Sequence, residues 1–81
     1  MKGVRFTNYS GKYTGNGDGT TKTFEISHVL TTTPQWAVAT SGISGIPVES
    51  ITYDTTKLYV TLAEAPESGT GNVVINWIAG L

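Results

Sequence analysis

Residues Asn16 to His28 have the sequence NGDGTTKTFEISH, which joins a loop to a strand. The Asn-Gly and Asp-Gly pairs at its start favour the positive φ angles of tight turns. From Thr21 onward apolar and polar side chains alternate, which places Phe24 and Ile26 on one face. Alternation of this kind is typical of a half-buried β-strand. The stretch therefore predicts a turn that leads into a sheet.

The rest of the chain continues this pattern, with strand-like runs separated by turn residues. The expected strands are Gly3 to Tyr9, Thr21 to His28, Gln35 to Ser41, Val48 to Asp54, Lys57 to Ala63 and Asn72 to Ala79. Ser10 to Gly19 is expected to be a polar loop. Val48 to Asp54 should pair with Lys57 to Ala63 as a hairpin, and Leu58, Val60 and Leu62 should point inward. Helical spacing of apolar residues is absent. We therefore predict an all-β fold, a small antiparallel β-sandwich or barrel of about six or seven short strands.

The chain has 81 residues, which is enough for a single domain. We predict one β domain over residues 1–81, in which residues 1–15 are either less ordered or form an interface. A domain of this size buries only about 60% of the surface of its unfolded chain. Cysteine is absent, so no disulfide can support the fold. Oligomerisation is the remaining common support, and we expect a homo-oligomer.

The composition is poor in charge: 14% of the residues are charged and the net charge is −1. Such a chain has no basic patch for a nucleic-acid backbone. Met1 to Phe6 lacks the apolar segment of a signal peptide. The most apolar run, Val73 to Leu81, is too short to span a membrane as a helix. We therefore expect a soluble, unexported chain that starts at Met1 and has neither a nucleic-acid nor a membrane partner.

The last expected strand, Asn72 to Ala79, is largely apolar on both faces. One face carries Val73, Ile75 and Trp77, and the other carries Val74, Asn76 and Ile78. A strand in a half-solvated sheet should have one polar face. This strand is therefore either central between two layers or in contact with another subunit. We take Val74, Trp77 and Ile78 as candidate interface residues.

Asn16 to Gly19 also begins like a calcium-binding loop. If Asn16 were the first ligand, the twelfth position would be Ser27 rather than the glutamate that such loops need. The flanking sequence predicts strand rather than helix, so the glycines also lack the helix N-terminus that a phosphate site uses. We therefore expect a turn here, without a metal or a cofactor.

His28 is the only histidine and follows Ser27 directly. Neighbouring residues on a strand point to opposite faces, so the two side chains cannot form a nucleophile and its base. The carboxylates show no sign of converging in a cleft, as paired acid–base catalysts must. We expect His28 to hydrogen-bond backbone groups near the end of its strand, and the chain not to be an enzyme.

The aromatic residues divide into two groups. Trp36 alternates in phase with Val38, and Trp77 with Ile75, which predicts that both tryptophans lie in the core. Candidate surface contacts are Tyr9, Tyr13 and Tyr59. Exposed rings on a flat sheet can stack on sugars, so a glycan is a possible partner.

The segment GDGTTKTFEISHVLTTTPQWAVAT, residues 17–40, is followed by a predicted hairpin and the closing strand NVVINWIA. This arrangement resembles a recurrent pattern in small β-modules of tailed-bacteriophage virion proteins. The matching positions are Gly17, Asp18, Gly19, Thr21, Phe24, Ile26, His28, Leu30, Pro34 and Asn72 to Ala79. The resemblance covers roughly residues 15–79. It implies a kind of module that occurs in tail fibres, tail-associated proteins and head or decoration proteins.

The resemblance implies a non-enzymatic structural protein of the virion, made in the host cytoplasm without a signal peptide. A capsid decoration or cement-type protein is the leading hypothesis, because a short chain of this kind suits addition in many copies to a particle surface. Decoration proteins that resemble it often sit as trimers at local threefold positions, so a homotrimer is favoured. The expected partner is the major capsid protein or a tail protein. The alternative is a tail-fibre or tail-associated module that binds a receptor or glycan.

Overall fold

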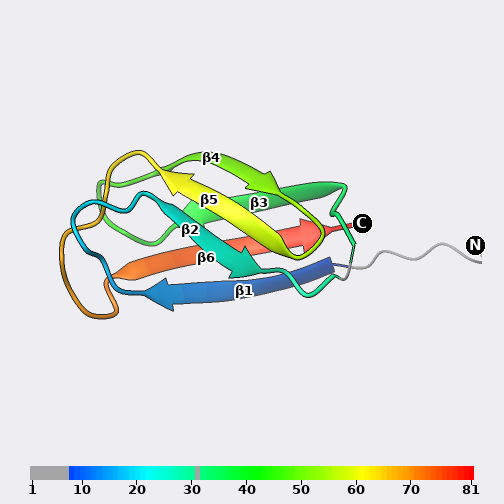
Figure 1. The fold of residues 1–81 in the computed structure, drawn as a ribbon, viewed down its shortest axis with the longest axis horizontal. Helices are drawn as coiled ribbons and strands as arrows, with labels where there is room; N and C mark the ends of the chain where they lie inside the picture. Colours follow the sequence, from blue (N-terminus) through cyan, green and yellow to red (C-terminus); the bar gives the residue numbers. More distant parts are fainter. Residues whose placement is uncertain (1–7, 31) are drawn as a thin grey trace, which may run out of the picture.

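The computed structural model describes residues 8–30 and 32–81, which form six β-strands and no helix (Figure 1). The strands are β1 (Asn8–Gly15), β2 (Thr23–Ser27), β3 (Trp36–Ser41), β4 (Val48–Tyr53), β5 (Lys57–Leu62) and β6 (Val73–Gly80). Two antiparallel three-stranded sheets result, sheet A in the order β1-β6-β3 and sheet B in the order β2-β5-β4. The prediction of a small all-β sandwich is confirmed.

The core lies between the two sheets, where β2 and β5 cross over β6 (Figure 1). Its buried apolar residues are Phe24, Ile26, Leu30, Leu58, Val60, Leu62, Val73, Ile75 and Ala79. The inward positions expected on β2 and β5 are confirmed. Each such side chain stabilises the fold by about 1.5–3 kcal/mol, and the two central strands, β5 and β6, carry most of them.

The β4–β5 hairpin forms as the sequence predicts, with Tyr53 opposite Leu58 and Val48 opposite Leu62. The carboxylate of Asp54 closes its turn, because it accepts the backbone N–H groups of Thr56 at 2.9 Å and Lys57 at 2.8 Å. Aspartate often stabilises a turn in this way. A short polar link is therefore sufficient to bring the two strands together.

The first strand differs from its prediction. Residues 10–15 belong to β1, which pairs with β6 along its whole length, so the polar loop expected from Ser10 is wrong over this stretch. Gly11 lies in this strand because the indole of Trp77 on β6 packs close to its backbone, and not because the chain turns there. A Cβ on Gly11 would lie 3.1 Å from the indole nitrogen of Trp77. The strand expected from Gly3 and the special role expected for residues 1–15 fall partly on residues 1–7, outside the described residues.

The loops between β1 and β2 and between β5 and β6 are joined at one end of the sandwich. The side-chain oxygen of Asn72 accepts the N–H of Gly17 at 2.8 Å, and that of Asn16 accepts the N–H of Gly71 at 2.7 Å. Gly17 is required here, since a Cβ at this position would overlap the carbonyl oxygen of Glu67. We call this set of contacts the loop clamp.

Candidate interaction surface

The outer face of sheet A carries large apolar side chains. Residues opposite each other in a sheet share a face, and the register places Val38 opposite Ile78 and Trp36 opposite Gly80. Val74 lies on the same face, two positions before Asn76. We call Trp36, Val38, Val74 and Ile78 the apolar stripe. It follows β3 and β6 on the side of sheet A that faces away from the core.

Two members of the stripe are strongly exposed: Trp36 is 40% and Val38 is 54% exposed. The prediction that Trp36 lies in the core beside Val38 is therefore wrong. On β3 the inward positions are held by the small residues Ala37 and Ala39, and Ala39 lies opposite Trp77. Because the bulky indole of Trp77 fills the space on the inner face, β3 turns its own large side chains outward.

Trp36 rests against the backbone of β6. A Cβ added to Gly80 would overlap the indole of Trp36. Gly80 therefore allows one side of the ring to pack on the sheet while the rest stays exposed. The position of the ring is fixed by the fold, as expected for a residue that presents a contact surface.

The three candidate interface residues do not share one surface. Val74 and Ile78 lie on the outer face of sheet A and are half-buried. Trp77 lies on the inner face and packs against the core cluster, although it too is only half-buried. The structure therefore groups Val74 and Ile78 with Trp36 and Val38, and separates them from Trp77.

The candidate tyrosines are also separated. Tyr9 is 47% exposed. Tyr13 packs against the core, with its ring centre 6.0 Å from that of Phe24. Tyr59 is half-buried and donates its hydroxyl proton to Asp54 at 2.7 Å, which raises the pKa of Tyr59. These rings do not form a common platform for a sugar.

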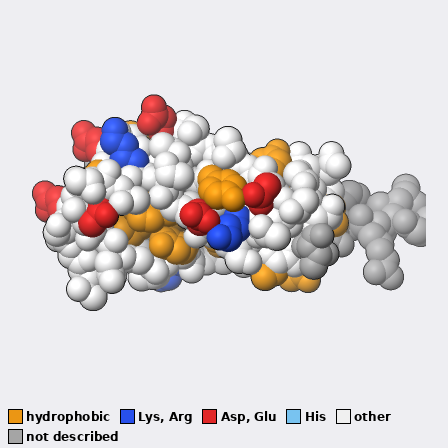
Figure 2. Space-filling model, in the orientation of Figure 1, with side chains coloured by type: hydrophobic (Ala, Val, Ile, Leu, Met, Phe, Trp, Pro, Cys, Tyr) orange, Lys and Arg blue, Asp and Glu red, His pale blue; other side chains and the backbone are white. Residues whose placement is uncertain are grey.

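The outer face of sheet B differs from that of sheet A. It carries an ion pair between Lys57 and Glu25 at 2.7 Å and a hydrogen bond between the hydroxyls of Thr23 and Thr61. The hydrogen bond and the charge of Glu25 raise the pKa of Lys57. Figure 2 shows charged side chains of both signs side by side near the middle of the molecule. Charged and hydroxyl side chains thus lie on one outer face, and the apolar stripe lies on the other.

The turn that resembles a calcium loop is held by its own hydrogen bonds. Oδ2 of Asp18 accepts the hydroxyl proton of Thr21 at 2.6 Å, and Oδ1 accepts the backbone N–H groups of Thr21 at 2.7 Å and Thr20 at 2.9 Å. These bonds, the hydroxyl of Thr21 first, hold the pKa of Asp18 well below its usual range. Within residues 8–30 and 32–81, no three His, Asp or Glu side chains are placed to share a metal ion.

His28 is buried, and its ring bonds to backbone groups of Asp54 and Leu30. Its Nε2 lies 2.8 Å from the carbonyl oxygen of Asp54, and its Nδ1 accepts the N–H of Leu30 at 3.1 Å. Nε2 must therefore carry the proton and donate it to Asp54. The prediction that His28 bonds backbone near the end of its strand is confirmed.

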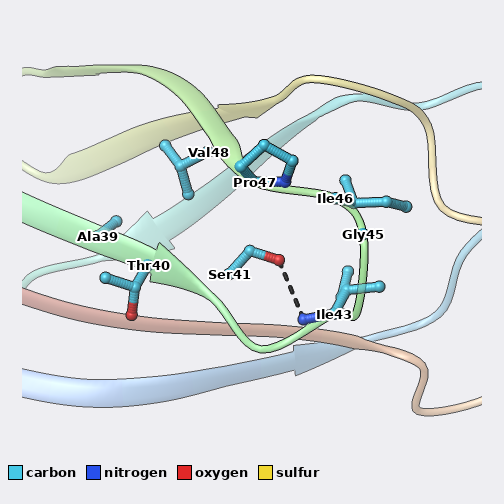
Figure 3. Close-up of a pocket in the computed structure, with 8 residues that line it drawn as sticks. All are labelled: Ala39, Thr40, Ser41, Ile43, Gly45, Ile46, Pro47 and Val48. Atoms are coloured by element: carbon cyan, nitrogen blue, oxygen red, sulfur yellow. Dashed lines mark hydrogen bonds between the residues drawn. The ribbon is translucent and has the colours of Figure 1, made fainter.

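The loop between β3 and β4 frames an open hollow of about 580 Å³ (Figure 3). A hydrogen bond from the N–H of Ile46 to the carbonyl of Ile43 closes a turn in which Gly45 has a φ of +79°. The apolar lining is Ala39, Ile43, Ile46, Pro47 and Val48. A second hollow of about 580 Å³ shares Ile43, Gly45 and Ile46 and extends to Glu64 and Glu67. We call the two together the loop hollow.

Two parts of these surfaces were missed by sequence reasoning. The signal for the stripe was the pair of alanines that alternates with Trp36 and Val38, since small residues fit beneath a large neighbour on the next strand. The signal for the loop hollow was the segment GISGIP, in which two isoleucines stand in a glycine-rich bend. Both isoleucines pack against the edge of the core and stay half-buried.

No family model matches the chain, and neither a curated protein nor a solved structure matches it. The described part of the chain contains no helix suited to crossing a membrane.

Proposed function

We propose that the chain is a non-enzymatic structural protein of a phage virion, of the capsid decoration or cement type. It binds the particle surface as a homo-oligomer, with a trimer favoured. The observation that carries this proposal is the apolar stripe, in which Trp36 and Val38 are exposed on β3. Large exposed apolar patches mark sites of protein contact.

The hydrogen bonds and the ion pair made by the polar side chains support a structural role for the protein. Asp18, Asp54 and His28 make hydrogen bonds that hold turns together. Glu25 pairs with Lys57 at the surface of sheet B. Side chains engaged in this way stabilise the fold rather than converge on a substrate. The assignment to a virion rests on the resemblance of residues 15–79 to phage β-modules.

The proposal is tested by co-sedimentation of the purified chain with heads assembled from the major capsid protein of the virus that encodes it. We expect saturable binding of many copies per head. Replacement of Val38 by Thr keeps the β-branched shape but adds a hydroxyl to the stripe, and should weaken binding. Replacement of Glu25 by Gln, on the polar face of sheet B, is the matched control. A folded oligomer that does not sediment with the heads would contradict the proposal.

The alternative, a tail-fibre or tail-associated glycan-binding module, is supported by one observation. The ring of Trp36 is exposed and packs on Gly80, in the same row of sheet A as the polar side chain of Asn8. Aromatic rings beside polar groups suit sugars. Glycan binding that is lost in Trp36→Ala but kept in Tyr13→Phe would favour this function over capsid decoration.

A further inference from the structure

The loop hollow lies at the end of the sandwich opposite the start of β1. Ile43 and Ile46 stand on a turn that reaches past the end of β3, beside Pro47 and Val48 (Figure 3). Both isoleucines are only half-buried, and they contribute to both parts of the hollow. Both also pack against the core, and their exposed parts offer an apolar surface to a side chain from outside.

Two acidic residues, Glu64 and Glu67, line the second part of this hollow. Figure 2 shows several acidic side chains at this end of the molecule, at the left of the view, with one basic side chain among them. Among the described residues the ion pair is that of Lys57 with Glu25, so neither Glu64 nor Glu67 is paired with a described cation. The hollow therefore suits a ligand that is both apolar and basic.

Residues 1–7 have the complementary chemistry. Their sequence, MKGVRFT, combines the cations Lys2 and Arg5 with the apolar residues Val4 and Phe6. They join the described chain at Asn8, which pairs with Gly80 at the far end of sheet A from the loop hollow (Figure 1). The described chain thus begins at one end of the molecule, and the hollow lined by apolar and acidic residues lies at the other.

The segment is too short for Val4 and Phe6 to reach Ile43 and Ile46 of their own copy. Val4 is four residues from Asn8 and can lie at most about 14 Å away. Ser41, the last residue of β3, is level with Tyr13, since both pair with Ile75. Tyr13 is five residues along β1 from Asn8, or about 17 Å, and the loop hollow extends past Ser41. Only another copy can therefore place Ile43 and Ile46 next to Val4 and Phe6.

We propose that residues 2–6 of one copy bind in the loop hollow of the next copy, with Val4 and Phe6 against Ile43 and Ile46. Lys2 and Arg5 then lie near Glu64 and Glu67. This inference rests on the oligomeric part of the proposed function and adds the contact that joins the copies. The contact is heterologous, because two different surfaces meet, and such contacts close into a ring when the rotation permits. A ring of this kind accommodates the favoured trimer.

The test exchanges charge across the proposed contact and measures assembly of the full-length chain by sedimentation velocity over a range of concentrations. The double variants Lys2→Glu with Arg5→Glu, and Glu64→Lys with Glu67→Lys, should each weaken association about tenfold or more. Mixing the two double variants restores opposite charges at one contact and should restore association between them. Glu25→Lys reverses a charge on the outer face of sheet B and should leave assembly unchanged.

A second measurement locates the contact. A synthetic peptide of residues 1–7 should shift the amide resonances of Ile43, Ile46 and Val48 and dissociate the oligomer of the full chain. Assembly that is unchanged by both charge reversals, in variants whose circular dichroism matches the parent, would overturn the inference alone. Assembly that responds as expected while the oligomer fails to bind heads would overturn the proposed function alone.

Discussion

Val29 has a strained backbone conformation. It is the non-glycine residue with a positive φ, +53°, and its side chain is 59% exposed. The hydrogen bond between Nδ1 of His28 and the N–H of Leu30 holds this conformation, because it ties together the two residues on either side. A β-branched side chain in the left-handed region is strained by roughly 1–2 kcal/mol.

We expect Val29→Asn to stabilise the protein by up to about 1 kcal/mol, because asparagine tolerates the left-handed region. Urea unfolding followed by tryptophan fluorescence measures the change. Val38→Asn is the matched control: it also replaces an exposed valine, but in an extended strand, where asparagine is disfavoured. Equal loss of stability in both variants would show that position 29 is not strained.

Asp18 and Asp54 make the stability of the folded protein depend on pH. Hydrogen bonds, from the Thr21 hydroxyl to Asp18 and from the Thr56 amide to Asp54, hold both pKa values well below the usual range. A carboxyl whose pKa is lower in the folded state stabilises the fold above its unfolded pKa of about 4. That contribution is lost as the pH falls below this value toward the folded pKa.

We therefore expect the free energy of unfolding to fall between about pH 4 and pH 2. Replacing Asp18 and Asp54 together by asparagine should lower stability at pH 6 and flatten this dependence. Urea titrations at pH 6, 4 and 2 measure both effects. An unchanged acid slope in the double variant would assign the effect to other carboxyl groups.

At the scale of elements, the loop clamp holds two distant segments of the chain together. Gly17 approaches Glu67 so closely that a Cβ would overlap its carbonyl oxygen, and Asn72 bonds to both. We expect Gly17→Ala to destabilise the protein by about 2 kcal/mol or more, since backbone must move to admit the methyl group. Thermal unfolding measures the loss. Thr70→Ala, an exposed change in the second loop, should have little effect, and a similar melting temperature for both variants would contradict the role of the clamp.

Elements defined by local alternation were predictable from the sequence. Phe24 and Ile26 on β2, and the β4–β5 hairpin, need only the strand period and a short turn. β1 was not predictable in this way, because its partner β6 lies at the other end of the chain and Gly11 indicates a turn when considered alone. Alternation on β3 shows that Trp36 and Val38 share a face. It cannot show which face is inward, which is decided by Trp77 on the neighbouring strand.

The interaction surface also combines features that follow from local alternation with features that depend on strand pairing. Placing Val74 and Ile78 on one face required only the period of β6, and the structure has them on the outer face of sheet A. The other half of the apolar stripe, on β3, depends on pairing between strands. The loop hollow depends on two loops, β3–β4 and β5–β6, that meet at one end of the fold. Surfaces assembled from several segments are fixed by the tertiary fold rather than by local pattern.

At the scale of the whole molecule, the two ends and the two outer faces differ in character. The polar face of sheet B is opposite the apolar stripe of sheet A, and the acidic loops are opposite the end where β1 begins (Figures 1 and 2). A molecule with this asymmetry can make two separate contacts at once. The loop end serves assembly between copies in our proposal, and the stripe remains available for the particle.

The central place of β6 in sheet A has a consequence for how the protein is made. A ribosome produces β1 and β3 well before β6, and neither of those strands pairs with any other strand in the described chain. Sheet B can form as soon as β5 emerges, but sheet A must wait until residues 73–80 leave the exit tunnel. Pairing over such separations is slow. During translation, β1 and β3 are therefore unprotected edges, and nascent chains on neighbouring ribosomes should be most prone to mispairing at this stage.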